Sequence, residues 1–178
     1  MTADRPRCSA FLAMSLDGFI ARKDGSIDWL ARVELPDEDY GFQRFFDSVD
    51  TLAIGRSTWE VARAFDPWPY QGKRCVVLTH RPLDALHGEE SFAGSAWQLV
   101  EQFSTMGTHH VYVDGGTVVR QFLAAGLLDA LTVSIIPLVL GEGIPLFGGA
   151  LHEHGLVLEE SRSWPSGLLQ VRYRVADR

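Results

Sequence analysis

The sequence predicts an α/β fold in which a mostly parallel sheet has helices on both faces and finishes in antiparallel strands. Two observations support this fold class. Up to Ala125, short β-branched and apolar runs alternate with helical patterns, as in chains that build parallel sheets. After Leu127 the helical patterns stop, and strand-like runs follow that are joined by a turn signal at residues 164–167.

Each element is placed by its own pattern. Strands are expected where apolar, β-branched runs end at Gly, Pro or Asp, which selects residues 8–14, 51–55, 74–79, 109–113, 129–137, 155–162 and 168–175. Helical spacing selects residues 36–49, 57–64, 95–106 and 117–125. The first helix would open with three acidic residues, which suits the positive end of the helix dipole. The last would end at Gly126, a typical C-terminal cap.

Length, charge and cysteine content restrict the class of protein. A chain of 178 residues suits one domain, here residues 1–178. Its net charge of −7 would repel nucleic acid and anionic membranes, so a small-molecule ligand is expected. No apolar run approaches the roughly 20 residues that cross a bilayer. Cys8 and Cys75 lie in apolar runs, a pattern typical of buried, reduced thiols in a cytoplasmic protein.

Residues 111–123 join a strand to a helix through Gly115 and Gly116. Amide groups at a helix start have no partner within the helix, the dipole is positive there, and glycine lets an anion approach the main chain. A phosphate would fit this position. A glycine pair between a strand and a helix is also common turn chemistry, so other parts of the sequence must decide between the two interpretations.

Cationic side chains follow two other strands. Gly55 and Arg56 end the strand at 51–55 and are followed by hydroxyl side chains, a combination that can bind a phosphate. Arg56 can equally pair with Glu60 or Asp66 on or near the same helix. The next strand ends in Thr79-His80-Arg81, where a hydroxyl, an imidazole and a guanidinium together suit a phosphomonoester.

Taken in order, these motifs resemble the dihydrofolate reductase-like fold family, especially its stand-alone bacterial members and the reductase domain of riboflavin biosynthesis. Residues 13–21 (AMSLDGFIA) resemble the opening strand and loop, and residues 54–60 (IGRSTWE) resemble the Gly-Arg-x-Thr-Trp-Glu motif. Residues 114–116 resemble the glycine doublet. Residues 136–147 (IPLVLGEGIPLF) are similar to the Gly-rich loop of the riboflavin-pathway branch. The resemblance covers nearly the whole chain and implies a three-layer α/β/α domain.

The resemblance also implies that NADPH binds across the strand ends. The residues expected to contact it are Ala13 and Ile20 beside the nicotinamide, Gly55, Arg56, Ser57 and Thr58 near the phosphates, Thr79, His80 and Arg81 at the adenosine 2′-phosphate, and Gly115, Gly116, Thr117 and Val118 at the pyrophosphate. Asp114, just before the doublet, either organises this loop or reacts. No Gly-x-Gly-x-x-Gly follows the first strand, so this is not a Rossmann fingerprint.

The substrate is expected between a loop at residues 22–30, the first helix and the loop at 141–147, with Trp29, Leu140 and Gly141 at the pocket. Reduction of a C=N bond needs a proton donor, and Glu38 and Asp17 are the candidates. Both have structural alternatives, since acids suit a solvated helix start and an Asp-Gly pair is a turn signal. A riboflavin-type substrate needs several cations for its ribose phosphate, and the sequence does not place a full set.

The sequence therefore favours an NADPH-dependent reductase acting on a small pteridine- or pyrimidine-like heterocycle or a carbonyl compound. The alternative is a catalytically silent NADPH-binding sensor or assembly protein, and a true dihydrofolate reductase, which Glu38 would mark, is a third reading. No metal site is expected, because His109-His110 and the alternating His152 and His154 suit surface positions. The apolar strands after Leu127 favour a homodimer.

Overall fold

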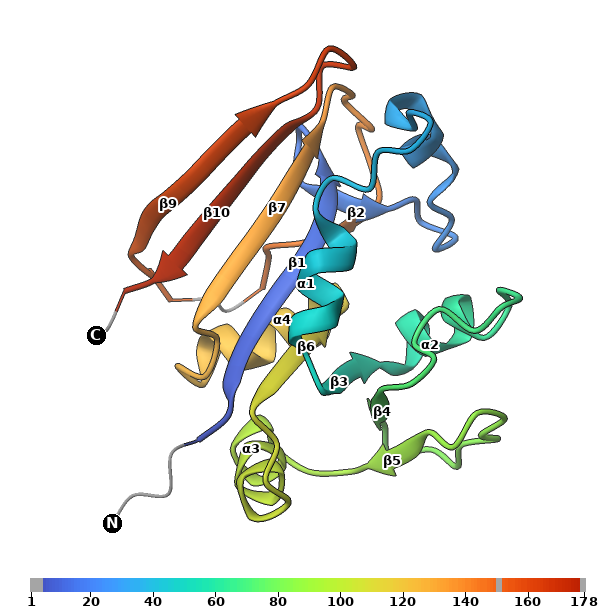
Figure 1. Ribbon diagram of the computed structural model, residues 1–178, viewed down its shortest axis with the longest axis vertical. Coiled ribbons are helices and arrows are strands. Elements are labelled where there is room, and N and C mark those ends of the chain that lie inside the picture. The colour runs from blue at the N-terminus through green and yellow to red at the C-terminus, as the bar shows by residue number, and fades with distance from the viewer. Residues whose placement is uncertain (1–4, 150–151, 177–178) are drawn as a thin grey trace.

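The computed structural model describes residues 5–149 and 152–176 (Figure 1). Its main sheet has eight strands: β1 (Arg7–Ser15), β3 (Thr51–Gly55), β4 (Arg74–Leu78), β5 (Glu90–Phe92), β6 (His110–Asp114), β7 (Ala130–Ile136), β9 (Leu156–Ser163) and β10 (Leu169–Val175). Their order across the sheet is β5-β4-β3-β6-β1-β7-β10-β9. Along this order, each neighbouring pair from β5 through β4, β3, β6 and β1 to β7 is parallel. β10 runs antiparallel to both of its neighbours, β7 and β9. The predicted sheet, with its antiparallel C-terminal strands, is confirmed.

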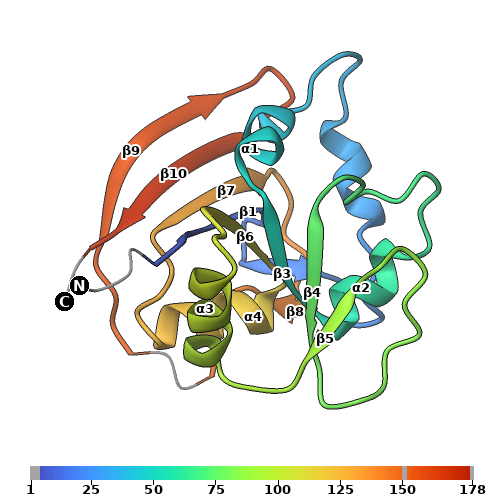
Figure 2. The ribbon, with the colours of Figure 1, turned by 60° about the horizontal axis from the view of Figure 1, so that its bottom comes forward.

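Four α-helices cover the two faces of this sheet: α1 (Phe42–Ser48), α2 (Arg56–Ala62), α3 (Ala96–Thr105) and α4 (Gly116–Ala124). Figure 2 shows α3 and α4 next to each other on one side. Their apolar faces, with Phe103 and Phe122, pack in one buried cluster with Val113 and Val133 of the sheet. Phe46 of α1 and Trp59 of α2 belong to a second cluster on the opposite face. The domain therefore has three layers, because each helix buries one apolar stripe against the sheet.

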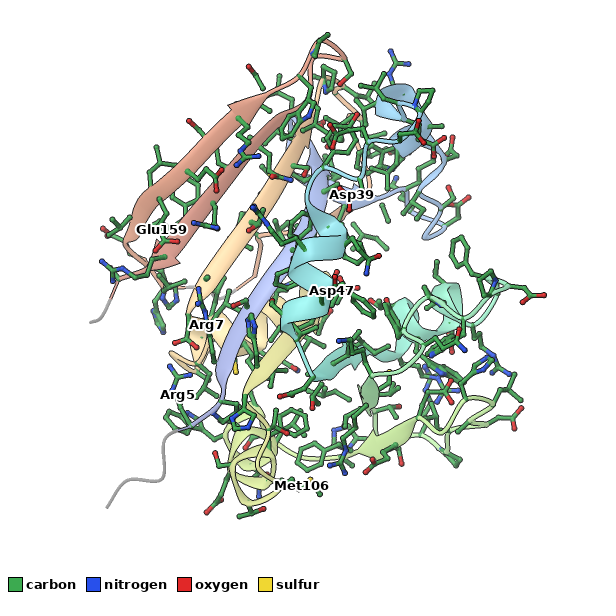
Figure 3. All side chains as sticks on the ribbon, viewed as in Figure 1. Arg5, Arg7, Asp39, Asp47, Met106 and Glu159 are labelled. Atoms are coloured by element: carbon green, nitrogen blue, oxygen red, sulfur yellow. The ribbon has the colours of Figure 1, made fainter. Side chains whose placement is uncertain are left out.

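The first helix differs from its predicted range. The sequence pattern favours a start at Pro36, whereas α1 begins at Phe42. Asp37 and Tyr40 both have positive φ angles, 62° and 57°, and a helix cannot pass through such residues. The expected acidic first turn is therefore wrong. Asp39, labelled in Figure 3, lies just before the helix, and its carboxylate accepts hydrogen bonds from the backbone amides of Gly41 and Gln43 at 2.9 and 2.8 Å.

Three short elements outside the main sheet match none of the predicted strands or helices. β2 (Phe19–Ala21) and β8 (Ile144–Pro145) form a separate two-stranded sheet, and η1 (Asp28–Val33) is a 3₁₀ helix. β5 is also missing from the prediction. Runs of two or three residues are too short to show a period, so their pairing depends on tertiary contacts.

Both cysteines are buried and free, as their strand patterns predict. Removal of their thiols from water raises the pKa of Cys8 and of Cys75 to about 12. In the described part of the chain, no helix is long and apolar enough to cross a membrane. Within the same residues, no three side chains of His, Cys, Asp or Glu gather as a set of metal ligands.

Replacement of Phe122 tests the packing of α4 on the sheet. Phe122 is fully buried, so Phe122→Ala should lower the free energy of unfolding by about 3–5 kcal/mol through lost burial and a residual cavity. Urea denaturation followed by circular dichroism measures this. Trp97→Ala is the control, because Trp97 of α3 is 59% exposed and its loss should change stability by about 0.5 kcal/mol or less. Equal effects of the two variants would contradict the packing described.

Candidate active site

A cleft with a volume of about 790 Å³ lies at the carboxyl ends of β1, β3, β4 and β6. The starts of α2 and α4 form one part of its wall, and residues 20–30 form another. Parallel pairing places these strand ends at one edge of the sheet, which is where ligands bind in open α/β sheets. The location expected from the sequence is thus the location of the largest hollow described for this domain.

The starts of α2 and α4 meet at Gly115 and Thr58. Gly115 has a φ angle of 94°, and a Cβ atom there would overlap the Thr58 hydroxyl. A Cβ atom at Gly116 would come within 2.9 Å of the Ile20 side chain. Neither helix has a side-chain cap, so the first amide groups of both remain available to a ligand. The glycine pair therefore allows the start of α4 to lie close to the start of α2 and to Ile20. The free amides of the two helix starts form a cradle that faces the cleft.

The cofactor residues expected from the resemblance gather around this cradle. Thirteen of the fourteen line the cleft, and Arg81 is the exception. Arg56 lies in the cleft wall with its guanidinium already engaged, because its Nε donates to Glu60 Oε1 at 2.8 Å and another of its nitrogens donates to the Pro82 carbonyl at 2.9 Å. The pairing with Glu60 that the sequence left open is therefore present, and Arg56 still borders the cleft.

The structure does not bring the three expected substrate-pocket residues into the cleft. Trp29 is 2% exposed and packs in a small buried cluster with Ile136 and Leu168. Leu140 packs against the same cluster, and Gly141 belongs to the neighbouring loop. The wall from this part of the chain is made instead by Ile27 and Leu30, on either side of Trp29 in the sequence. Which side chains face the cleft depends on how they are arranged around η1. A 3₁₀ helix has no strong sequence signature, so the sequence could not show this arrangement.

Asp17 braces a loop and lies outside the cleft lining. Its carboxylate accepts hydrogen bonds from the Ser15 hydroxyl at 2.6 Å and from the amides of Leu140 and Gly141 at 3.0 and 2.7 Å. The Ser15 hydroxyl, followed by these backbone amides, lowers the pKa of Asp17. A carboxylate held ionised in this way is a poor proton donor, so the geometry does not favour the role expected from the sequence.

Glu38 is also engaged elsewhere. It accepts hydrogen bonds from the Tyr40 amide at 2.7 Å and from the Trp164 indole nitrogen at 3.0 Å. Trp164 lies in the turn between β9 and β10, so Glu38 links the loop before α1 to that turn. Glu38 does not line the cleft. The residue that would mark a true dihydrofolate reductase therefore lies outside the cleft lining.

Asp114 is the carboxylate that lines the cleft within the described residues. It lies at the end of β6 and accepts hydrogen bonds from the Gly115 amide at 2.8 Å and the Tyr70 hydroxyl at 3.2 Å. Burial raises the pKa of Asp114, and those two hydrogen bonds limit the rise. Tyr70 was missed at the sequence level, because the irregular segment between α2 and β4 that carries it has no period.

Comparison with known proteins agrees with this geometry. The family model of the RibD C-terminal domain matches residues 6–169. The uncharacterised protein YwjB of Bacillus subtilis is 35% identical over 157 residues, which cover 86% of this chain and 90% of YwjB. A solved structure from Shewanella sp. PV-4, provisionally assigned to riboflavin biosynthesis, is 31% identical with a TM-score of 0.89, and the match covers 96% of this chain and 99% of that one.

A more distant structure shows how widely the fold is shared. Dihydrofolate reductase from Enterococcus faecalis, solved in complex with NADP(H), has a TM-score of 0.65 at 18% identity, over 96% of this chain and 97% of that one. The three-layer dihydrofolate reductase-like fold expected from the motifs is confirmed. With its family model matching most of the sequence, the chain belongs to the RibD C-terminal domain family.

Proposed function

We propose that this protein is an NADPH-dependent reductase of a small heterocyclic or carbonyl substrate. One observation carries the proposal: a single cleft joins a cradle of free helix-start amides to the half-buried carboxyl group of Asp114, whose pKa is raised by desolvation. Membership of the RibD C-terminal domain family suggests a pyrimidine reductase-like activity. The shared fold of a dihydrofolate reductase that binds NADP(H) supports the choice of cofactor.

The residues of the cleft fit the cofactor. Gly115 and Gly116 would hold the pyrophosphate against the start of α4, where amides are free and a Cβ atom would fill the space. Arg56 and His80 are the basic side chains that line the cleft among the described residues, and they would face the remaining phosphate. Ala13 and Ile20 would border the nicotinamide on the β1 side.

Bound NADPH would supply a hydride to an electron-poor C=N or C=O carbon, whose nitrogen or oxygen then needs a proton. We assign delivery of that proton to Asp114. Burial favours its protonated form, and Tyr70 fixes the orientation of its carboxyl group. The enclosed surroundings, with Tyr112 and Phe11 also in the wall, would limit the access of bulk water to this group.

A catalytically silent NADPH-binding protein remains the second candidate. It is favoured by one observation, the engagement of Asp17 and Glu38 in structural hydrogen bonds away from the cleft. The two candidates share the cofactor site and differ in the role of Asp114. Binding experiments therefore test the cofactor, and turnover experiments at Asp114 separate the candidates.

Gly115→Ala tests the cradle. The new methyl group would meet the Thr58 hydroxyl and strain a residue with positive φ, so NADPH affinity should fall about tenfold or more, as calorimetric titration would show. Gly126→Ala is the matched control. Gly126, at the far end of α4, also has a positive φ, of 68°, but nothing lies within 4 Å of its Cβ position. Comparable losses in both variants would mean that strain alone, and not the cradle, sets the affinity.

Arg56→Ala tests the preference for NADPH. Removal of this guanidinium should weaken NADPH about tenfold and NADH much less, since charge-assisted bonds to the 2′-phosphate are lost only with NADPH. Parallel titrations with both nucleotides measure the difference. Arg63→Ala is the control, because Arg63 ends the same helix, pairs with Asp84 and does not line the cleft. Equal weakening of NADPH and NADH by Arg56→Ala would remove Arg56 from the 2′-phosphate site.

Asp114→Asn tests the proton donor. Turnover should fall by about 100-fold to 10,000-fold, while the dissociation constant of NADPH changes little. Activity needs protonated Asp114, so the wild-type rate should fall as pH rises through its raised pKa. The Tyr70 hydroxyl lowers that pKa, so Tyr70→Phe should move the falling limb to higher pH. Normal turnover by the Asp114→Asn variant would leave Asp114 with a structural role only. The same would follow if the falling limb of the pH–rate profile did not shift in Tyr70→Phe.

A further inference from the structure

Part of the cleft lining is apolar and takes no part in the cofactor assignment. It comprises Phe11, Ile27, Leu30, Phe42, Val61 and Phe65, which we call the apolar end. These side chains come from four segments: β1, the chain leading into and through η1, the helix α1, and the helix α2 with the residues just after it. Aromatic and aliphatic walls of this kind bind the flat or apolar body of a small molecule.

Three of these side chains are exposed to solvent although they are large and apolar. Ile27 is 36% exposed, Val61 37% and Phe65 53%. They border the cleft from different segments, Ile27 from the chain before η1 and the other two from the end of α2 and just beyond it. Exposed apolar side chains that share one hollow, unlike single ones scattered over a surface, indicate a binding site for an apolar group.

None of these six lining side chains is charged. Among the described residues that line the cleft, the basic ones are Arg56 and His80, both at strand ends next to the amide cradle. Arg22 and Lys23 of the neighbouring loop do not line the cleft, and each is paired with a carboxylate, Arg22 with Asp28 at 2.7 Å and Lys23 with Glu142 at 2.5 Å. A phosphate dianion brought to the apolar end would lose its hydration without gaining a counter-charge. The net charge of −7 would add a further penalty.

We propose that the substrate is an uncharged aromatic or heteroaromatic compound without a phosphate group, which binds with its ring at the apolar end. This proposal rests on the proposed reductase function for its chemistry and deepens it by naming the substrate class. In the reaction, a C=O or C=N carbon of the substrate gains the hydride, its oxygen or nitrogen gains a proton, and NADPH is oxidised to NADP⁺. The substrate of this protein would then differ from the ribose phosphate expected of a riboflavin-pathway reductase.

The test uses two probes that differ by one phosphate group, 1-naphthol and 1-naphthyl phosphate. The protein is first titrated with NADP⁺ in a calorimeter and then, saturated with NADP⁺, with each probe. Because NADP⁺ cannot donate a hydride, the readout is binding alone. We expect 1-naphthol to bind about tenfold or more tightly than 1-naphthyl phosphate, since no cation compensates the dianion. Equal or tighter binding of the phosphate, or no binding of either probe, would overturn the proposal.

A charge-adding variant makes the test more specific. Ile27→Arg places a guanidinium at an exposed position of the apolar end, so it should reverse the preference in favour of 1-naphthyl phosphate. Ile27→Gln is the matched control, because it alters size and polarity without charge and should weaken both probes alike. An unchanged preference in Ile27→Arg would place the naphthalene ring elsewhere and contradict the proposal. Failure of the first NADP⁺ titration, with 1-naphthol still bound by the unliganded protein, would reject the reductase function and retain the apolar ligand site.

Discussion

The close approach of the α2 and α4 starts is the constraint on which the site depends. Parallel pairing of β3 with β6 brings the two strand ends side by side, and the helices that follow must then begin next to each other. Gly115 permits this because it has no Cβ atom to meet Thr58. Because the two helix starts are close together, the unpaired amides of both line the same cleft. Sheet topology and anion chemistry are therefore two results of a single packing requirement.

The sequence could predict what depends on local pattern. Apart from the short β5, the strands of the central sheet have clear patterns, as do the helices α2, α3 and α4, and the glycine doublet marks a turn into a helix. For that reason the residues at the strand ends and helix starts that line the cleft could largely be named from the sequence. The start of α1 could not be predicted, because the positive φ angles of Asp37 and Tyr40 accompany contacts between distant parts of the chain. One example is the hydrogen bond that the side-chain amide of Gln170 donates to the Tyr40 carbonyl.

The surroundings of Asp17, Glu38 and Trp29 could not be predicted in the same way, for a physical reason. Asp17 and Glu38 are acidic residues in loops, and a loop carboxylate can either react or accept backbone amides. Sequence alone does not show which amides lie nearby. Besides their near neighbours Ser15 and Tyr40, the partners of these two carboxylates are more than a hundred positions away in the chain: Leu140 and Gly141 for Asp17, and Trp164 for Glu38. Likewise, whether Trp29 or its neighbours face the cleft depends on the rotation of one 3₁₀ turn.

The ion pair between Lys23 and Glu142 connects the segment at residues 20–30, part of which lines the cleft, to the loop before β8, whose Ile144 also lines it. Both side chains are largely exposed, at 68% and 70%, so water and salt screen their attraction and the pair is weak. Ionic strength would therefore act on the contact between these two segments while leaving the packing of the sheet untouched. Ligand exchange in this protein should consequently respond to salt even when the ligand itself carries no charge.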